Sequence, residues 1–258
     1  MTMQLLLDDA GIEYDYVQME TALPPLLFLH GALGVRGQFD ALRKHFPERS
    51  QIALDFPSHG ESHVTHGAIN GERLARAVLA LLDALQIEKV DIIGHSMGGY
   101  AALVLAHLAP ARVNSIVNLG TKFYWSEEAI DKTSKELDGD QLRARSPRHY
   151  EALAALHPAS GVDQTLRLTQ GLITDFARWQ LSEEMVRATK VPILLSAGDR
   201  DNLVPMAEIV KLFDALESKL NAVAILPSTP HPLQHLPLDC FELIVRRFWV
   251  AAVRKTLA

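Results

Sequence analysis

One serine lies in a pattern that is typical of an enzymatic nucleophile. Ser96 is the centre of a G-x-S-x-G motif that begins at Gly94 and ends at Gly98. An apolar run at 90–93 precedes it and a small-residue stretch at 97–108 follows, which predicts a strand, a tight strained turn and a helix. Such a turn lifts the serine hydroxyl above the carboxyl ends of the strands, where open α/β sheets bind ligands. The alternative is a glycine-rich turn without chemistry.

A serine hydroxyl is a weak nucleophile, so it needs a base, and the base needs an orienting acid. For a nucleophile on this kind of turn, the chain order is serine, then acid, then histidine. Asp199 and Asp201 follow a strand-like run at 193–196, and His231 follows another at 222–226. Parallel strands would end at one sheet edge, which predicts that these groups meet Ser96. His235 is a second candidate for the base.

The elements that must position these groups alternate along the chain. Residues 12–18 alternate apolar and polar side chains, as a half-buried edge strand does. Alternating strands and helices predict a mainly parallel sheet flanked by helices on both faces. Strands are predicted at 12–18, 26–29, 51–54, 90–93, 115–119, 193–196 and 222–226, and helices at 72–86, 97–108, 206–220 and from 238 onward.

The alternation stops between Leu119 and Val191, a stretch too long for a simple loop. We predict a helical cap or lid at 121–189, inserted into a core domain formed by 1–120 and 190–258. Its aromatic residues could form the core of the cap or a wall of the substrate pocket. Phe123 and Trp125 directly follow the predicted strand at 115–119, so we assign them to substrate binding, with Phe176 and Trp179 as further candidates. Lys122 and Arg178 are either contacts for an anionic substrate or solvated cations.

Three further motifs complete a resemblance to a known family. His30-Gly31-Ala32 resembles the oxyanion loop of the α/β-hydrolase superfamily, residues 55–62 its D-x-P-x-x-G-x-S loop, and residues 198–205 its acid loop. The resemblance covers nearly the full chain and implies an α/β-hydrolase fold. It implies that Asp201 rather than Asp199 is the acid. It also favours His231, six residues before Pro237, over His235 as the base. The backbone N–H groups of Ala32 and Met97 would form the oxyanion hole, while His30 would hold its own loop.

The resemblance implies a serine hydrolase that cleaves a carboxylic ester or a related acyl bond through an acyl-enzyme. Other reactions of the same machinery stay open: cleavage of a carbon–carbon bond in oxo-dienoate acids, or a cofactor-free perhydrolase. An aspartate in place of Ser96 would indicate an epoxide hydrolase or a dehalogenase, so both are disfavoured. A non-catalytic ligand-binding receptor on this fold is a further alternative, because a fold does not prove a function.

Composition excludes several other classes. With 25 Lys and Arg against 31 Asp and Glu, the net charge is −6, which argues against a nucleic-acid partner. The single cysteine, Cys240, excludes an internal disulfide and is expected to be a buried small hydrophobe. The histidines at 59, 63 and 66 are interpreted as a solvated loop rather than a metal site. No targeting segment or membrane span is visible. We therefore expect a cytoplasmic protein that acts on a small molecule without a cofactor or metal, with its number of subunits left open.

Overall fold

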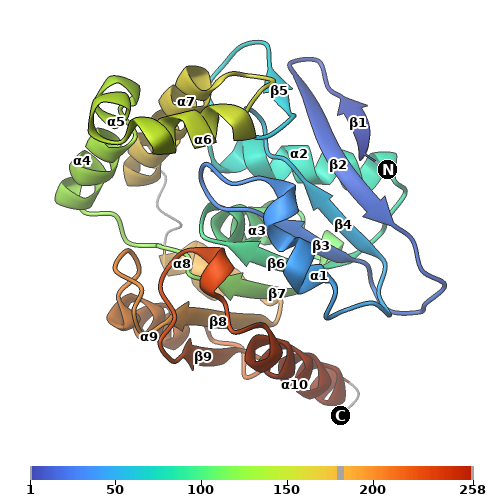
Figure 1. Cartoon of the computed structure of the whole chain (residues 1–258). Helices are drawn as coiled ribbons and strands as arrows, with labels where there is room; N and C mark the ends of the chain where they lie inside the picture. Colours follow the sequence, from blue (N-terminus) through green and yellow to red (C-terminus); the bar gives the residue numbers. More distant parts are fainter. Residues whose placement is uncertain (1, 179–182, 257–258) are drawn as a thin grey trace.

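A central β-sheet organises the molecule (Figure 1). The computed structural model describes residues 2–178 and 183–256. Within these residues the sheet has nine strands in the order β1-β2-β4-β3-β6-β7-β8-β9, with β5 paired to β2. The strands are β1 (Thr2–Leu6), β2 (Ala10–Val17), β3 (Leu26–Leu29), β4 (Gln51–Leu54), β5 (His63–Val64), β6 (Val90–His95), β7 (Val113–Leu119), β8 (Ile193–Gly198) and β9 (Ala222–Leu226).

The sheet is parallel from β4 to β9 and antiparallel at its N-terminal edge. Strands β3, β4, β6 and β8 are buried along their whole length, which explains their continuous apolar runs. The predicted, mainly parallel sheet is thus confirmed. The prediction that residues 12–18 form an edge strand is wrong, because β1 pairs with the outer side of β2. Alternation of apolar and polar side chains indicates that one face of a strand is exposed. It does not show whether the strand lies at the edge of the sheet.

Helices cover both faces of the sheet. Side chains of β3 alternate between two apolar layers, with Leu27 and Leu29 in one and Leu26 and Phe28 in the other. The first layer is covered by α2 (Gly71–Ala84), α3 (Met97–Leu108) and α9 (Met206–Ala215). The second is covered by α1 (Asp40–Arg43) and α10 (Leu238–Thr256). Short 3-10 helices lie at η1 (Arg36–Phe39), η2 (Pro110–Arg112) and η3 (Leu233–His235).

Two predictions for the C-terminal part need correction. The helix predicted over 206–220 ends at Ala215, because Leu216 is extended and a turn from Ser218 to Asn221 leads into β9. Cys240 is exposed rather than buried. Its neighbour Phe241 enters the core, and consecutive helical residues point about 100° apart.

The described part of the segment between β7 and β8 is mainly helical and contains no strand. It contains α4 (Glu127–Glu136), α5 (Gly139–Arg145), α6 (Pro147–Leu156), α7 (Val162–Arg178) and α8 (Glu183–Ala188). Side-chain oxygens of Ser126 and Asp138 cap the first two helices. Helices α4 to α7 gather on one side of the sheet (Figure 1). The division into cap and core remains a prediction, and Trp179 lies outside the described residues.

None of the described helices is long and apolar enough to cross a bilayer.

Candidate active site

The turn at Ser96 joins β6 to α3 with a strained backbone. Ser96 has φ +51°, a conformation that L-residues other than glycine rarely adopt. The flanking glycines allow the close contacts that the turn requires. A Cβ at Gly98 would lie 2.0 Å from the carbonyl oxygen of Leu29 at the end of β3, and one at Gly94 would lie 2.7 Å from the backbone of Gly98. A side chain at either glycine would therefore collide with the neighbouring strand or helix.

Three predicted side chains from three separate strand ends meet beside this turn. The Ser96 hydroxyl donates a hydrogen bond to His231 Nε2 at 3.2 Å. The opposite ring nitrogen, Nδ1, donates to Asp201 Oδ2 at 2.7 Å. The arrangement can transfer a proton from the serine to the imidazole while the carboxylate stabilises the resulting imidazolium.

Asp201 is held by its own loop as well as by the histidine. Its Oδ1 accepts hydrogen bonds from the backbone N–H groups of Leu203 and Val204, both at 2.9 Å. Burial by itself would raise the pKa of this carboxyl, but these hydrogen bonds and His231 bring the pKa below its usual value. The alternative acid, Asp199, instead accepts from the backbone of Thr229 at 3.3 Å. The alternative base, His235, lies in η3 with its side chain exposed.

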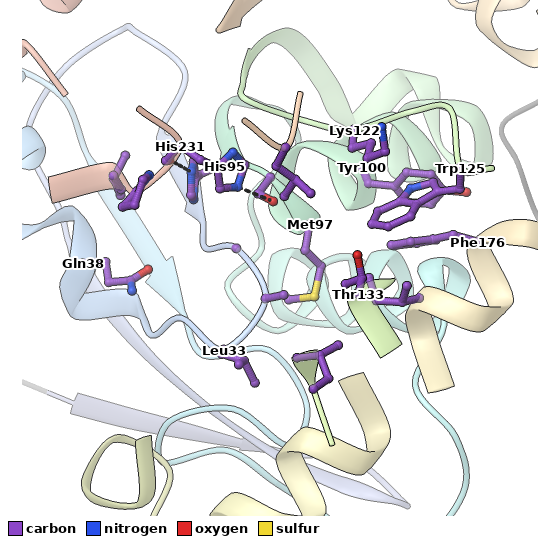
Figure 2. Close-up of a pocket in the computed structure, with 18 of the residues that line it drawn as sticks. Leu33, Gln38, His95, Met97, Tyr100, Lys122, Trp125, Thr133, Phe176 and His231 are labelled. Atoms are coloured by element: carbon purple, nitrogen blue, oxygen red, sulfur yellow. Dashed lines mark hydrogen bonds between the residues drawn. The ribbon is translucent and has the colours of Figure 1, made fainter. Parts of the chain in front are cut away.

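His95 positions the loop that carries His231, and no sequence signal had singled it out. Its Nε2 donates to the backbone carbonyl of His231 at 3.0 Å, and the two rings lie 5.1 Å apart (Figure 2). Burial lowers the pKa of His95 to about 4, so its ring is neutral near neutral pH. Nδ1 is buried without a hydrogen-bond partner in the described chain, and a Cβ at Gly31 would lie 2.9 Å from it. His95 thus touches the serine turn, the His30-Gly31 loop and the base loop.

The predicted oxyanion donors line one cavity. Ala32 lies in a turn closed by the Gly34 N–H and the Gly31 carbonyl at 3.0 Å, with Leu33 at φ +56°. Met97 is the first residue of α3, where a backbone N–H has no intrahelical acceptor. Both residues line the cavity that reaches Ser96. The two N–H groups are therefore in positions from which they could bind an oxyanion.

Two loops of the core hold the oxyanion turn in place. The Nδ1–H of His30 donates to the Gly31 carbonyl at 2.7 Å, and its Nε2 accepts from the Phe56 N–H at 2.9 Å. His30 therefore holds its loop, as expected. Asp55 accepts from the backbone of Arg36 at 2.7 Å and from that of Glu61 at 3.0 Å, and it pairs with the Arg36 guanidinium. Burial raises the pKa of Asp55 despite these partners.

Three buried histidines connect the inserted helices to these loops. His30 and His59 have ring centroids 5.2 Å apart, and His59 and His157 lie 5.6 Å apart. His157, at the end of α6, accepts from the Gly60 N–H at 2.8 Å and donates to the Leu33 carbonyl at 3.2 Å. His59 is fully buried, so its assignment to a solvated loop is wrong: it packs between the rings of His30 and His157. No group of metal-ligating side chains occurs among the described residues.

The cavity over Ser96 has a volume of about 320 Å³ and a mainly apolar wall (Figure 2). Trp125 and Phe176 line it with ring centroids 5.9 Å apart, and Tyr100 lies 4.1 Å from Phe176. Phe123 is buried in the core and is absent from the lining. The remaining lining residues are Gly31, Ala32, Leu33, Gln38, His95, Ser96, Met97, Lys122, Thr133, Leu137, Ile173, Leu203, His231, Pro232, Leu233 and Gln234.

The segment that follows β7 contacts all three predicted catalytic residues. A Cβ at Gly120 would lie 3.3 Å from Asp201 Oδ2 and 3.5 Å from His231 Nδ1. The Thr121 hydroxyl donates to the Ser96 carbonyl at 2.9 Å. Sequence reasoning missed both residues. The available signal was their position directly after the strand that neighbours β6, because the carboxyl ends of adjacent parallel strands share an edge.

Comparisons with known proteins agree with this architecture. The family model for the alpha/beta hydrolase fold matches residues 24–147. The dihydrolipoyllysine-residue acetyltransferase component of the acetoin cleaving system from Pseudomonas putida is 30% identical over 228 residues, which cover 81% of this chain and 59% of that protein. The esterase YbfF from Escherichia coli strain K12 is 33% identical over 163 residues, which cover 63% of this chain and 56% of that protein. The alignments therefore span less than two thirds of either relative.

Solved structures show the same fold over nearly the whole chain. A hydrolase from Pseudomonas aeruginosa superposes with a TM-score of 0.79 at 21% identity, covering 96% of this chain and 98% of that one. The enol-lactonase from Burkholderia xenovorans superposes with a TM-score of 0.78 at 18% identity, covering 96% of this chain and 100% of that one. This chain therefore has the alpha/beta hydrolase fold, and residues 24–147 match the family model for that fold.

Proposed function

We propose that this protein is a serine hydrolase that cleaves a carboxylic ester or a related acyl bond of a small molecule. The observation that carries the proposal is the continuous hydrogen-bond chain from Ser96 through His231 to Asp201 at the floor of an apolar cavity. The esterase relative supports the same reaction class. A non-catalytic ligand-binding receptor would not need this hydrogen-bonded set of side chains.

In the proposed reaction, His231 Nε2 takes the Ser96 proton as the oxygen attacks the acyl carbon. The backbone N–H groups of Ala32 and Met97 bind the oxyanion of the tetrahedral intermediate, and each such donor is worth on the order of 3 kcal/mol of barrier. His231 then protonates the leaving alcohol, and an acyl-Ser96 ester remains. Water, deprotonated by His231, attacks that ester and releases the acid. Trp125 and Phe176 would contact the substrate arm in the cavity. The proposed steps require no metal or cofactor.

Replacing the nucleophile tests the proposal. We expect Ser96→Ala to lower the turnover of a short p-nitrophenyl ester on the order of 10⁶-fold and to abolish fluorophosphonate labelling, because the remaining groups cannot form the acyl-enzyme. The control is Ser218→Ala, in the loop after α9, which should leave both readouts unchanged. Ester turnover retained within tenfold in Ser96→Ala would contradict the assignment. A folded wild-type protein that is neither labelled nor active would favour a receptor.

A panel of substrates, tested on the wild-type protein, separates the rival reactions. A panel of p-nitrophenyl esters graded by acyl length, with oxo-dienoate acids and a perhydrolysis assay, reports which bond is cleaved. Turnover confined to the dienoate acids would replace the esterase with a carbon–carbon bond hydrolase. Turnover confined to short acyl chains would fit the limited cavity volume.

A further inference from the structure

An ion pair is built into the wall of the cavity at Lys122. The Lys122 ammonium lies 2.6 Å from Glu208 Oε1, at the first turn of α9, and 5.7 Å from the centre of the Trp125 ring. The lysine side chain is 9% exposed and lines the cavity. It is therefore not a solvated cation, which was one of the two sequence-based alternatives; the other was a contact for an anionic substrate. Arg178, the other candidate, has no described side chain.

The position of Lys122 along the chain brings it close to the reacting groups. It follows Gly120, which packs against Asp201 and His231, and Thr121, which donates to the Ser96 carbonyl. The backbone on its N-terminal side is thus fixed by the catalytic groups themselves. Trp125, on its C-terminal side, is part of the cavity wall. The ammonium is consequently held beside the space that a substrate arm would occupy.

Glu208 cancels the charge of this lysine through one of its two carboxylate oxygens. The second oxygen, Oε2, is buried without a hydrogen-bond partner among the described residues. Of the described lining side chains, Lys122 alone carries a fixed charge. The Asp201 carboxylate, which pairs with His231, is a second negative charge near the site. A substrate carboxylate in this cavity would find Lys122 already paired, with two carboxylates nearby that repel it.

We propose that the Lys122–Glu208 pair is a specificity determinant that restricts the enzyme to esters whose arm in the cavity is uncharged. Glu208 acts against anionic substrates by pairing with Lys122, the one lysine or arginine in the described lining, which is discrimination through a repulsive element. The inference rests on the proposed hydrolase function and specifies its substrate class. It also implies that loss of the Glu208 charge alone frees Lys122 to bind a carboxylate.

Two pairs of esters, each with a neutral member and an anionic member of the same chain length, test the proposal. Dimethyl adipate and monomethyl adipate differ by a carboxylate on the acyl arm, and butyl acetate and 4-acetoxybutyrate differ similarly on the alcohol arm. We expect wild-type kcat/KM to favour the neutral member of at least one pair by tenfold or more. In Glu208→Gln, the anionic member of that pair should gain at least tenfold in kcat/KM, mainly through KM, while the neutral member changes less than threefold.

Matched variants show whether the gain comes from this lysine. Glu217→Gln removes the same charge from an exposed pair with Lys190, at 3.6 Å, and should leave both ratios unchanged. The double variant Lys122→Met with Glu208→Gln should lose the gain, because no cation remains in the described lining. Lys122→Met alone should keep the preference for neutral esters, which tests the selectivity even where Glu208→Gln fails to fold.

The outcomes distinguish the proposed charge selectivity from the proposed hydrolase function. A wild-type enzyme that hydrolyses both members of each pair equally well overturns the charge selectivity and leaves the hydrolase standing. A Glu208→Gln enzyme that gains no more on anionic esters than Glu217→Gln also overturns the selectivity alone. A wild-type protein that is inert to all four esters and is not labelled by fluorophosphonate overturns the proposed function, and the inference falls with it.

Discussion

At the residue scale, the candidate base is held through its backbone rather than through its ring alone. His95 donates to the carbonyl of His231, and its opposite nitrogen faces Gly31 in the oxyanion loop. A neutral imidazole is required there, since protonation would place a second cation beside His231 without an acceptor for the added proton. The lowered pKa of His95 agrees with this requirement. His95 is thus a positioning residue that aligns the base with the serine.

Substitution of His95 should separate positioning from binding. His95→Phe keeps the ring and loses the donor, so we expect kcat to fall by about 10- to 100-fold, as for misplaced catalytic groups, with KM nearly unchanged. His95→Gln can place an amide N–H near the position of Nε2 and should recover much of that loss. Steady-state kinetics and the rate of fluorophosphonate labelling measure both. Equal kcat in the two variants, or a loss confined to KM, would contradict the role.

At the element scale, the serine turn depends on the close approach of α3 to β3. The first turn of α3 rests on the carbonyl groups at the end of β3, and only a hydrogen atom fits at Gly98. The same approach places the N–H of Met97 next to the turn that holds Ala32. The packing of α3 against β3 and the geometry of the proposed oxyanion hole therefore depend on the same close contact.

Gly98→Ala tests that requirement. The added methyl group would lie 2.0 Å from the Leu29 oxygen, so α3 must move; we expect a loss of about 1–3 kcal/mol in unfolding free energy and a large loss of turnover. The control is Gly171→Ala in α7, where a Cβ would meet nothing within 4 Å. That change should stabilise the protein by about 0.5–1 kcal/mol through helix propensity. Chemical denaturation measures both, and a neutral Gly98→Ala would disprove the packing argument.

At the scale of the whole molecule, the inserted helices are anchored to the core at buried polar contacts. His157 bridges Gly60 and Leu33, and the Thr165 hydroxyl in α7 donates to the Ser58 carbonyl at 2.6 Å. Burial lowers the pKa of His30 to about 3, and it lowers the pKa of His59 and of His157 as well. A cluster of neutral histidines therefore joins the helices to the loop that carries Ala32.

This cluster predicts stability that is lost in acid. The unfolded chain binds a proton on each histidine near pH 6.5 and the folded protein only at lower pH, so the unfolded state holds more protons in between. Above pH 6.5 the buried histidines should not lower the free energy of unfolding. It should fall below that, by about 1.4 kcal/mol per pH unit for each histidine that stays neutral, down to about pH 3 for His30.

Denaturant unfolding at pH 7.5, 6 and 5 measures this slope. His157→Gln removes one of the buried imidazoles, so the slope should become smaller, although the protein is less stable at pH 7.5. His66→Gln, on an exposed side chain, is the control and should leave the slope unchanged. A slope that is the same in wild type and His157→Gln would show that the cluster does not carry the acid sensitivity.

Local patterns were enough for much of this molecule. Apolar runs bounded by turn-forming residues located the buried strands. The G-x-S-x-G motif and its flanking elements located Ser96, because backbone strain and close packing restrict the residue types at that turn. Chain order and strand ends left Asp199 or Asp201 as the acid and His231 or His235 as the base, and the resemblance to the α/β-hydrolase family favoured Asp201 and His231. The burial of His59 depends on His157, far away in sequence, and periodicity does not report such a contact. The added strand β1 and the exposure of Cys240 were not visible in the alternation or in the residue type.

The sequence, together with its family resemblance, therefore determined the fold class and the three side chains proposed for catalysis, since each follows the end of a predicted strand. Only the tertiary structure decided how they are supported and what the cavity admits. His95 meets the base loop across 136 positions of sequence, and Lys122 meets Glu208 across 86. No local pattern encodes such pairs, because they form only when the carboxyl ends of neighbouring strands are brought to one edge of the sheet.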